Sequence, residues 1–267
     1  MPKSVFAIAA HPDDIEFMMA GTFILLGRAG YELHLMTLAN GCCGTQIYDA
    51  ATIARIRREE TQAAARSVGA IFHESLVNDL EIFYERDTLR RLSAVVREVA
   101  PEIILTQSTQ EYMEDHQNTT RLVLAAAFAR GMPNFVVDPP RPAVDQPVTI
   151  YHALPYGLRD PLRRRVQPDL FVDITDVISA KWAMLACHRS QKEWLDASQG
   201  LDSYLVTMEK MSGAVGEMAN AAAEAGPTSA RFTYAEGWTR HLHLGYCAEA
   251  ADPLTDALGA RVRFARS

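Results

Sequence analysis

The sequence contains no hydrophobic run long enough for a transmembrane helix, which would need about 18 consecutive apolar residues. The N-terminal apolar stretch is short and runs directly into His11, Pro12 and two aspartates. A secretory signal peptide requires a longer apolar region followed by small residues at a cleavage site. We therefore expect a cytoplasmic protein with no membrane partner.

Excess positive charge is also missing. The 26 lysine and arginine residues are outnumbered by 33 aspartate and glutamate residues, giving a net charge of −7. Affinity for nucleic acids depends largely on cationic side chains that neutralise phosphates. The one compact basic run, at 163–165, is more typical of a solvated loop. The charge balance therefore argues against DNA or RNA as the main partner.

Cysteine is scarce, and none of the four cysteines forms a C-x-x-C pair. Cys42 and Cys43 are adjacent, and adjacent cysteines rarely pair with each other or make a zinc clip. Reduced thiols in a cytosolic protein fit this pattern best. A G-x-G-x-x-G motif is also missing after the first predicted strand. Two aspartates stand there instead, and they would repel the pyrophosphate of a dinucleotide.

What the sequence does contain is a regular alternation of predicted strands and helices. Strands are expected at 4–9, 32–38, 71–77, 103–107, 148–154 and 169–174, and helices at 17–29, 51–68, 87–100, 119–130, 176–188 and 204–225. Strands that alternate with helices are typical of βαβ units. We therefore predict an α/β, Rossmann-like three-layer fold with a mostly parallel sheet and helices on both faces. Without repeats or low-complexity tracts, residues 1–267 are expected to form a single domain with a C-terminal helical extension from about residue 200.

The strongest chemical signal follows the first predicted strand, where His11-Pro12-Asp13-Asp14 stands. Ligands of open α/β sheets bind outside the carboxyl ends of the strands. A tight turn at Pro12 can aim His11 and Asp14 at one point, and imidazole and carboxylate are good zinc ligands. A spare carboxylate beside the metal can act as a general base. The competing interpretation is a turn in which an aspartate caps the next helix.

A second signal, Asp115-His116, follows the fourth predicted strand and precedes the helix expected from Thr119. The carboxyl ends of parallel strands meet at one edge of the sheet, so this pair should lie near His11 and Asp14. His116 then becomes the third ligand, and Asp115 is a candidate partner that fixes the ring of a ligating histidine. Taken alone, Asp115-His116 would more often be a helix cap.

These motifs resemble those of the PIG-L/LmbE-like zinc-dependent de-N-acetylases. The resemblance extends over residues 4–240 and includes later elements: Arg57 and Glu60 with Val68-Gly69, Lys181 with His188-Arg189-Ser190-Gln191, and Tyr234-Ala235-Glu236-Gly237. It implies one zinc ion per chain bound by His11, Asp14 and His116, with Asp13 as general base and Arg57 as a substrate-binding residue. From the residues alone, Arg57 would more often belong to an ion-pair network on a helix surface. The resemblance also implies a homo-oligomer, either a trimer or a hexamer.

One position departs from the family pattern, because Met113 stands where the family commonly has the first histidine of H-P-D-H. Methionine can neither stabilise an oxyanion nor carry a proton. Tyr112 is our first candidate to replace that histidine as a substrate-binding group, with Glu111, Glu114 and His152 as alternatives. The other interpretation of Tyr112 is that it lines the entrance of the site.

The sequence therefore predicts a zinc-dependent amidohydrolase that de-N-acetylates an N-acetylated sugar or a related small molecule. The substituted histidine leaves two other functions open. One is an amidase for a non-sugar acylated amine or a thiol conjugate. The other is a non-catalytic metal-binding protein.

Overall fold

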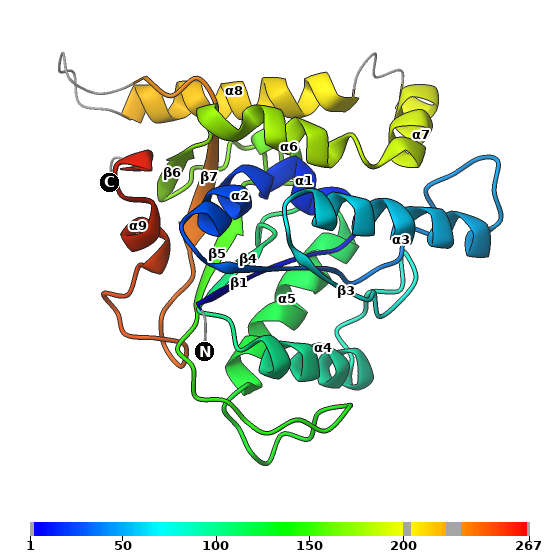
Figure 1. Ribbon diagram of the computed structural model, residues 1–267, viewed down its shortest axis with the longest axis vertical. Coiled ribbons are helices and arrows are strands. Elements are labelled where there is room, and N and C mark those ends of the chain that lie inside the picture. Colours follow the sequence, from blue (N-terminus) through cyan, green and yellow to red (C-terminus); the bar gives the residue numbers. More distant parts are fainter. Residues whose placement is uncertain (1–2, 200–203, 223–230, 266–267) are drawn as a thin grey trace.

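The computed structural model describes residues 3–199, 204–222 and 231–265, which build one eight-stranded sheet in the order β3-β2-β1-β4-β5-β7-β6-β8 (Figure 1). The parallel part comprises β1 (Ser4–Ala9), β2 (Glu32–Thr37), β3 (Ile71–His73), β4 (Ile103–Thr106) and β5 (Thr149–Ala153). All six residues of β1 are buried because helices cover both faces of the sheet. The predicted fold class is confirmed.

The remaining strands run antiparallel to their neighbours. They are β6 (Leu170–Asp173), β7 (Ala235–Arg240) and β8 (Val262–Phe264), and β7 lies between β5 and β6. From the sequence we expected a helical extension after about residue 200. That expectation was incomplete, because this region inserts one strand into the sheet and adds an edge strand.

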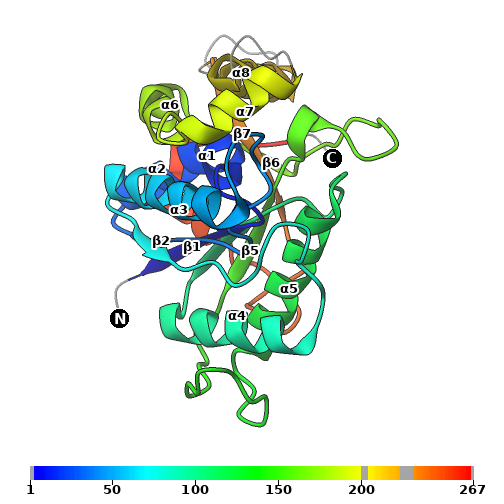
Figure 2. The ribbon, with the colours of Figure 1, turned by 90° about the vertical axis from the view of Figure 1, so that its right-hand side faces the viewer.

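Two layers of helices enclose the sheet (Figures 1 and 2). One face carries α1 (Asp14–Met18), α2 (Ala20–Arg28), α3 (Ala50–Ser67) and α6 (Ile178–Leu185), and the other carries α4 (Arg86–Val99) and α5 (Glu114–Ala129). Alternate residues of β1 serve the two layers, because Val5 and Ala7 belong to the core beneath α2 while Phe6 and Ile8 belong to the core beneath α4 and α5. This alternation follows from the two-residue period of a strand.

The C-terminal elements extend the first helical layer. α7 (Arg189–Gln199) and α8 (Tyr204–Ala222) lie beyond α6, and α9 (Pro253–Leu258) packs near α2 (Figure 1). Short 3-10 turns occupy Tyr156–Leu158, Thr175–Val177 and Gly259–Arg261. None of the described helices combines the length and the apolar character needed to cross a membrane.

Three predicted boundaries were wrong in ways that matter for the site. The helix expected at 17–29 is divided at Met19 into α1 and α2, because the buried Glu236 carboxylate accepts the first free N–H groups of α2. The helix expected from Thr119 already begins at Glu114, where acidic side chains suit the positive end of a helix. The third strand ends at His73 rather than at residue 77.

Candidate metal centre

The turn after β1 places three potential reactive groups in four residues. The Asp14 carboxylate accepts a hydrogen bond from the backbone N–H of His11 at 2.8 Å, which closes the turn. Asp13 has a φ of 99°, in the left-handed region that side chains other than glycine rarely adopt. Such a conformation costs about 1–3 kcal/mol and persists only where surrounding contacts impose it. The turn therefore directs the Asp14 carboxylate toward His11 and the Asp13 carboxylate toward Arg57.

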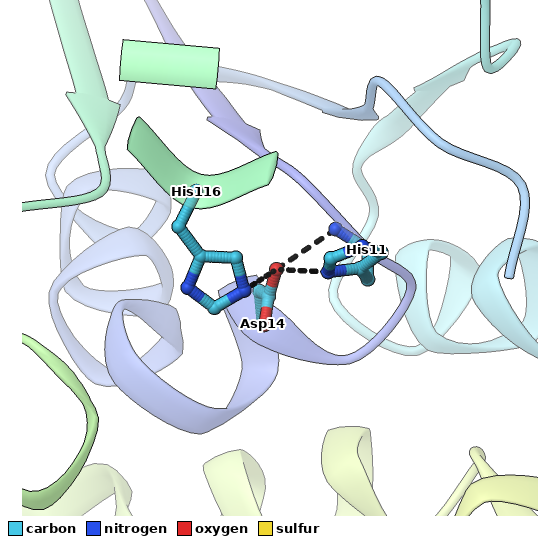
Figure 3. Close-up of side chains that lie close together, drawn as sticks. All are labelled: His11, Asp14 and His116. Carbon is cyan, nitrogen blue, oxygen red and sulfur yellow. Dashed lines mark hydrogen bonds and ion pairs between the residues drawn. The ribbon is translucent and has the colours of Figure 1, made fainter. Parts of the chain in front are cut away.

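His11, Asp14 and His116 converge at the carboxyl edge of the sheet (Figure 3). Asp14 Oδ2 lies 3.5 Å from His11 Nδ1 and 3.5 Å from His116 Nε2, and all three ligand atoms lie within 4.8 Å of one another. Two bonds of about 2.0–2.1 Å at a tetrahedral angle would separate ligand atoms by about 3.3–3.4 Å. The spacing therefore fits a tetrahedral metal ion with one position left open.

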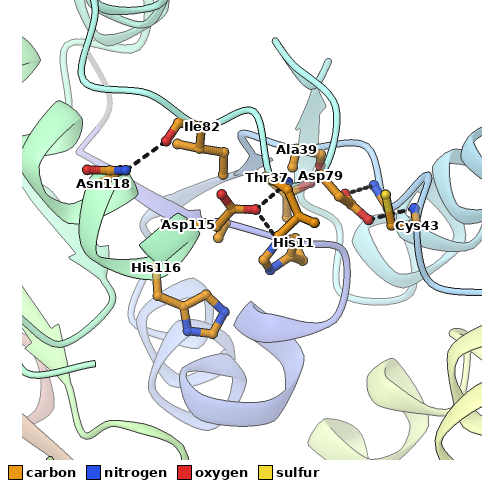
Figure 4. A network of polar contacts seen from close by, with 12 residues as sticks. His11, Thr37, Ala39, Cys43, Asp79, Ile82, Asp115, His116 and Asn118 are labelled. Atoms are coloured by element: carbon orange, nitrogen blue, oxygen red, sulfur yellow. Dashed lines mark hydrogen bonds and ion pairs between the residues drawn. The ribbon is translucent and has the colours of Figure 1, made fainter. Parts of the chain in front are cut away.

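Each histidine has a carboxylate on its other ring nitrogen. His11 Nε2 lies 2.9 Å from Asp115 Oδ2, which also accepts the backbone N–H of Leu80 at 2.7 Å (Figure 4). His116 Nδ1 lies 3.2 Å from Glu111 Oε2, although the ring nitrogen makes no well-aligned hydrogen bond. Asp115 thus orients His11, which belongs to the other motif, and not the adjacent His116. Sequence reasoning did not find Glu111 in the corresponding role for His116.

The pKa values of these groups depend on the charges of their neighbours. Burial disfavours a charged His11, but hydrogen bonds with Asp115 and Asp14 outweigh it and raise the pKa of His11 to about 10. Burial also opposes a charged Asp14, yet His116 and His11 hold the pKa of this carboxyl far below its usual range. The site therefore offers a carboxylate between two imidazoles, and a cation bound there would replace the protons of the imidazoles.

Asp13 points beside this centre into a separate set of contacts. The Arg57 guanidinium lies 3.3 Å from Asp13 Oδ1 and also donates to the carbonyl of Pro12, while the Tyr204 hydroxyl donates to Asp13 Oδ2. Burial raises the pKa of Asp13 to about 6, even though Arg57 and Tyr204 favour its charged form. Tyr204 is 191 residues away in the sequence, and no sequence signal indicated this contact.

Arg57 is not the surface residue that its charged neighbours suggest, because only 2% of it is exposed. The loop after β2 packs against its guanidinium, since a Cβ atom on Gly41 would come within 2.5 Å of Arg57 Cδ. One turn later, Glu60 accepts the backbone N–H and the hydroxyl of Ser190 at the start of α7. Arg57 and Glu60 therefore connect α3 to the turn after β1 and to α7.

A cavity of about 310 Å³ opens beside the three converging residues. Charged and polar side chains line part of it. They belong to His11, Asp13, Asp14, Arg57, Asp79, Gln107, Glu111, His116 and Gln191. The other lining residues are Phe17, Met18, Cys43, Gly44, Leu80, Tyr112, Met113, Ala153, Leu154, Tyr156, Trp194, Leu195 and Tyr204. Among these lining residues, Arg57 provides the one fixed positive charge. Several of the lining residues are apolar or aromatic.

Tyr112 lies at the mouth of the cavity and is about half exposed. Its ring centroid is 6.1 Å from that of His116 and 6.4 Å from that of Tyr156. Burial of the hydroxyl and the nearby Asp14 raise the pKa of Tyr112 to about 12, so the phenol keeps its proton at neutral pH. Met113 also lines the cavity, directly before α5.

The later sequence motifs support the site from behind. Glu236 on β7 forms a buried ion pair with Lys181 at 2.6 Å and accepts the N–H groups of Gly21 and Thr22. His188 Nε2 lies 3.2 Å from Glu16 Oε1 in another buried pair. These residues fix α1 and α2 against α6 and the sheet.

The first motifs lie in a part of the chain that matches a known family model. Residues 6–127 match the family model described as PIG-L, GlcNAc-PI de-N-acetylase. The chain is 29% identical to the 4-oxalmesaconate hydratase of Pseudomonas putida, over 71% of this chain and 74% of that protein. It is 28% identical to the diacetylchitobiose deacetylase of Thermococcus kodakarensis, over 71% of this chain and 70% of that protein.

A solved structure extends the similarity to almost the whole chain. The 4-carboxy-2-hydroxymuconate hydratase of Pseudomonas putida superposes with a TM-score of 0.73 at 26% identity, covering 90% of this chain and 96% of that one.

Proposed function

We propose that the chain is a member of the PIG-L/LmbE-like family, whose model matches residues 6–127, and that it is a zinc-dependent hydrolase that removes an acetyl group from the nitrogen of a sugar or a related small molecule. The observation that carries the proposal is the arrangement of four residues. His11, Asp14 and His116 converge with the spacing of metal ligands, and Asp13 stands beside them with an elevated pKa. A catalytic zinc site needs three such ligands, an open position and a nearby base.

The donor set fits zinc, because two imidazoles and one carboxylate are borderline ligands, and each imidazole has a carboxylate on its far nitrogen. When bound, the ion would supply a Lewis acid that polarises the amide carbonyl and acidifies water. Asp13 accepts the proton of the attacking water and afterwards returns it to the leaving nitrogen. Arg57 keeps Asp13 in place and, as in the family, contributes to substrate binding.

Tyr112 is the group that we assign to the oxyanion in place of the missing histidine. Its phenol is protonated at neutral pH and lies at the cavity mouth on the side of His116. A neutral hydroxyl can donate to an oxygen on which negative charge develops. The aromatic residues that line the cavity also suit an acylated amine other than a sugar, which is the alternative substrate class that the sequence left open.

A hydratase is the second candidate, favoured by the 29% identity to the 4-oxalmesaconate hydratase of Pseudomonas putida. Addition of water to a double bond could use the same metal and base. A carboxylate substrate, however, is normally held by arginine or lysine side chains. Arg57 is the one such residue among the lining residues, and Asp13 already balances its positive charge. The charge of the cavity therefore favours a neutral amide.

The deciding experiment combines zinc content with acetate release from a panel of N-acetylated sugars and amines. We expect about one zinc at the His11 centre of each chain and release of acetate, with this zinc and the acetate release both lost in His116→Ala. His243→Ala removes a histidine that does not line the cavity and should retain both. Zinc without hydrolysis of any amide, combined with hydration of an unsaturated carboxylate, would replace the proposal by the hydratase. Light scattering would test the expected trimer or hexamer.

A further inference from the structure

We propose that Cys42, Cys43 and Asp79 form a second metal site, which takes a thiophilic divalent cation at the rim of the cavity. The sequence pattern does not predict this site, because two adjacent cysteines do not make a zinc clip. The structure adds Asp79, a third potential ligand 36 residues beyond Cys43. The three ligand atoms lie within 4.8 Å of one another, as do those of the His11 centre.

The distance between the two sulfurs carries this proposal. Cys42 Sγ and Cys43 Sγ lie 3.9 Å apart, and both cysteines are free. Two zinc–sulfur bonds of about 2.3 Å at a tetrahedral angle place their sulfurs about 3.8 Å apart. The dithiol thus already has the separation that one tetrahedral cation requires, and little movement would be needed on binding.

The loop that carries the thiols is held in this shape by its own contacts. Asp79 accepts the backbone N–H of Gly41 at 2.6 Å and that of Cys43 at 2.9 Å, one on each oxygen (Figure 4). Asn40 accepts the N–H of Cys42 at 3.1 Å. A carboxylate offers about four lone-pair sites, so Asp79 can hold the loop and still ligate a cation.

The site is accessible and chemically distinct from the first one. Cys43 is exposed, Cys42 is partly exposed and Asp79 is buried behind them. Cys43 and Asp79 line the cavity of the His11 centre. Two thiolates select soft cations, whereas imidazole and carboxylate ligands are harder. Binding would displace one proton from each thiol, so two protons leave for each cation that enters.

Occupancy of this second site would affect the first through the loop. The backbone at Gly41 and Gly44 packs directly against the Arg57 side chain, which in turn contacts Asp13. A cation that fixes the two sulfurs also fixes this stretch of backbone. We therefore expect turnover to change when the second site fills, after the first site is already occupied.

Cadmium titration of the zinc-loaded protein tests the site without relying on hydrolysis. Thiolate–cadmium bonds absorb in the ultraviolet, and we expect this band to saturate at one cadmium per chain, with two protons released. Cys42→Ser and Cys43→Ser should abolish the band. Asp79→Asn should weaken cadmium binding by about 10–100-fold or more. Loss of a residue that hydrogen-bonds to a metal ligand already has an effect of about this size.

Two matched controls separate this site from the rest of the protein. Cys187→Ser removes a free cysteine outside the cavity and should leave the band intact, as should His116→Ala, which disables the first centre. Absence of the band in the wild type, or its persistence in both Cys42→Ser and Cys43→Ser, would overturn the proposal. Because the readout is spectroscopic, failure of the hydrolase assignment would not affect it.

Discussion

The buried ion pair between Lys181 and Glu236 allows a quantitative prediction about stability. Their side chains are 1% and 3% exposed, and Lys181 Nζ lies 2.6 Å from Glu236 Oε1. Glu236→Gln keeps the size of the side chain but removes its charge, which leaves the ammonium group of Lys181 buried without a counter-charge. Breaking a buried pair in this way costs about 3–5 kcal/mol. The free energy of unfolding of a typical domain is about 5–15 kcal/mol, so this cost is a large part of it.

The double variant Lys181→Met/Glu236→Gln provides the sharper test, because it removes both charges. It should be more stable than Glu236→Gln alone, since no uncompensated charge remains. Chemical denaturation of the two proteins and of the wild type measures the difference. Arg55→Ala is the control: it breaks an exposed pair with Glu59 at 2.9 Å and should change the free energy of unfolding by at most about 1 kcal/mol. A double variant no more stable than Glu236→Gln would refute the reasoning.

Three further outcomes are expected. Asp13→Asn should keep its zinc but lower turnover by at least about 100-fold, because a general base contributes this much or more. Steady-state kinetics and metal analysis measure both quantities, and full turnover in this variant would contradict the role of Asp13. Tyr204→Phe removes a donor that favours the charged form of Asp13, so the pKa of Asp13 rises and the acid limb of the pH–rate profile should move to higher pH. Tyr156→Phe, which changes a tyrosine without that contact, should leave the limb in place. Asp115→Asn removes the partner of His11 and should weaken metal binding by about 10–100-fold, measured by competition with a chelator.

Local patterns were sufficient to predict the parallel half of the fold. Each of β1 to β5 is a short apolar run before a turn, and the helices between them end at glycine or before proline. Because such strands share a carboxyl edge, the sequence also predicted that His11 and His116 would meet. The position of β7 between β5 and β6 was not predictable in this way, since pairing between distant strands leaves no local periodicity.

The partners of the reactive residues were harder to predict than the reactive residues themselves. Asp115 was expected to act beside His116 but reaches His11, because the first turn of α5 faces the end of β1. Glu111 and Tyr204 occur in ordinary surroundings in the sequence, and only the folded chain brings them to His116 and Asp13. The sequence therefore reveals ligating side chains in a compact motif, whereas their supporting contacts depend on tertiary structure.

The dependence of Asp13 on Tyr204 has a consequence for the order in which the protein becomes competent during synthesis. All residues of the His11 centre lie within the first 116 positions, while Tyr204 lies on α8, near the end of the chain. Chains emerge and fold from the N-terminus at about 5–20 residues per second. The residues of the metal-binding set are therefore synthesised several seconds before the tyrosine that holds Asp13.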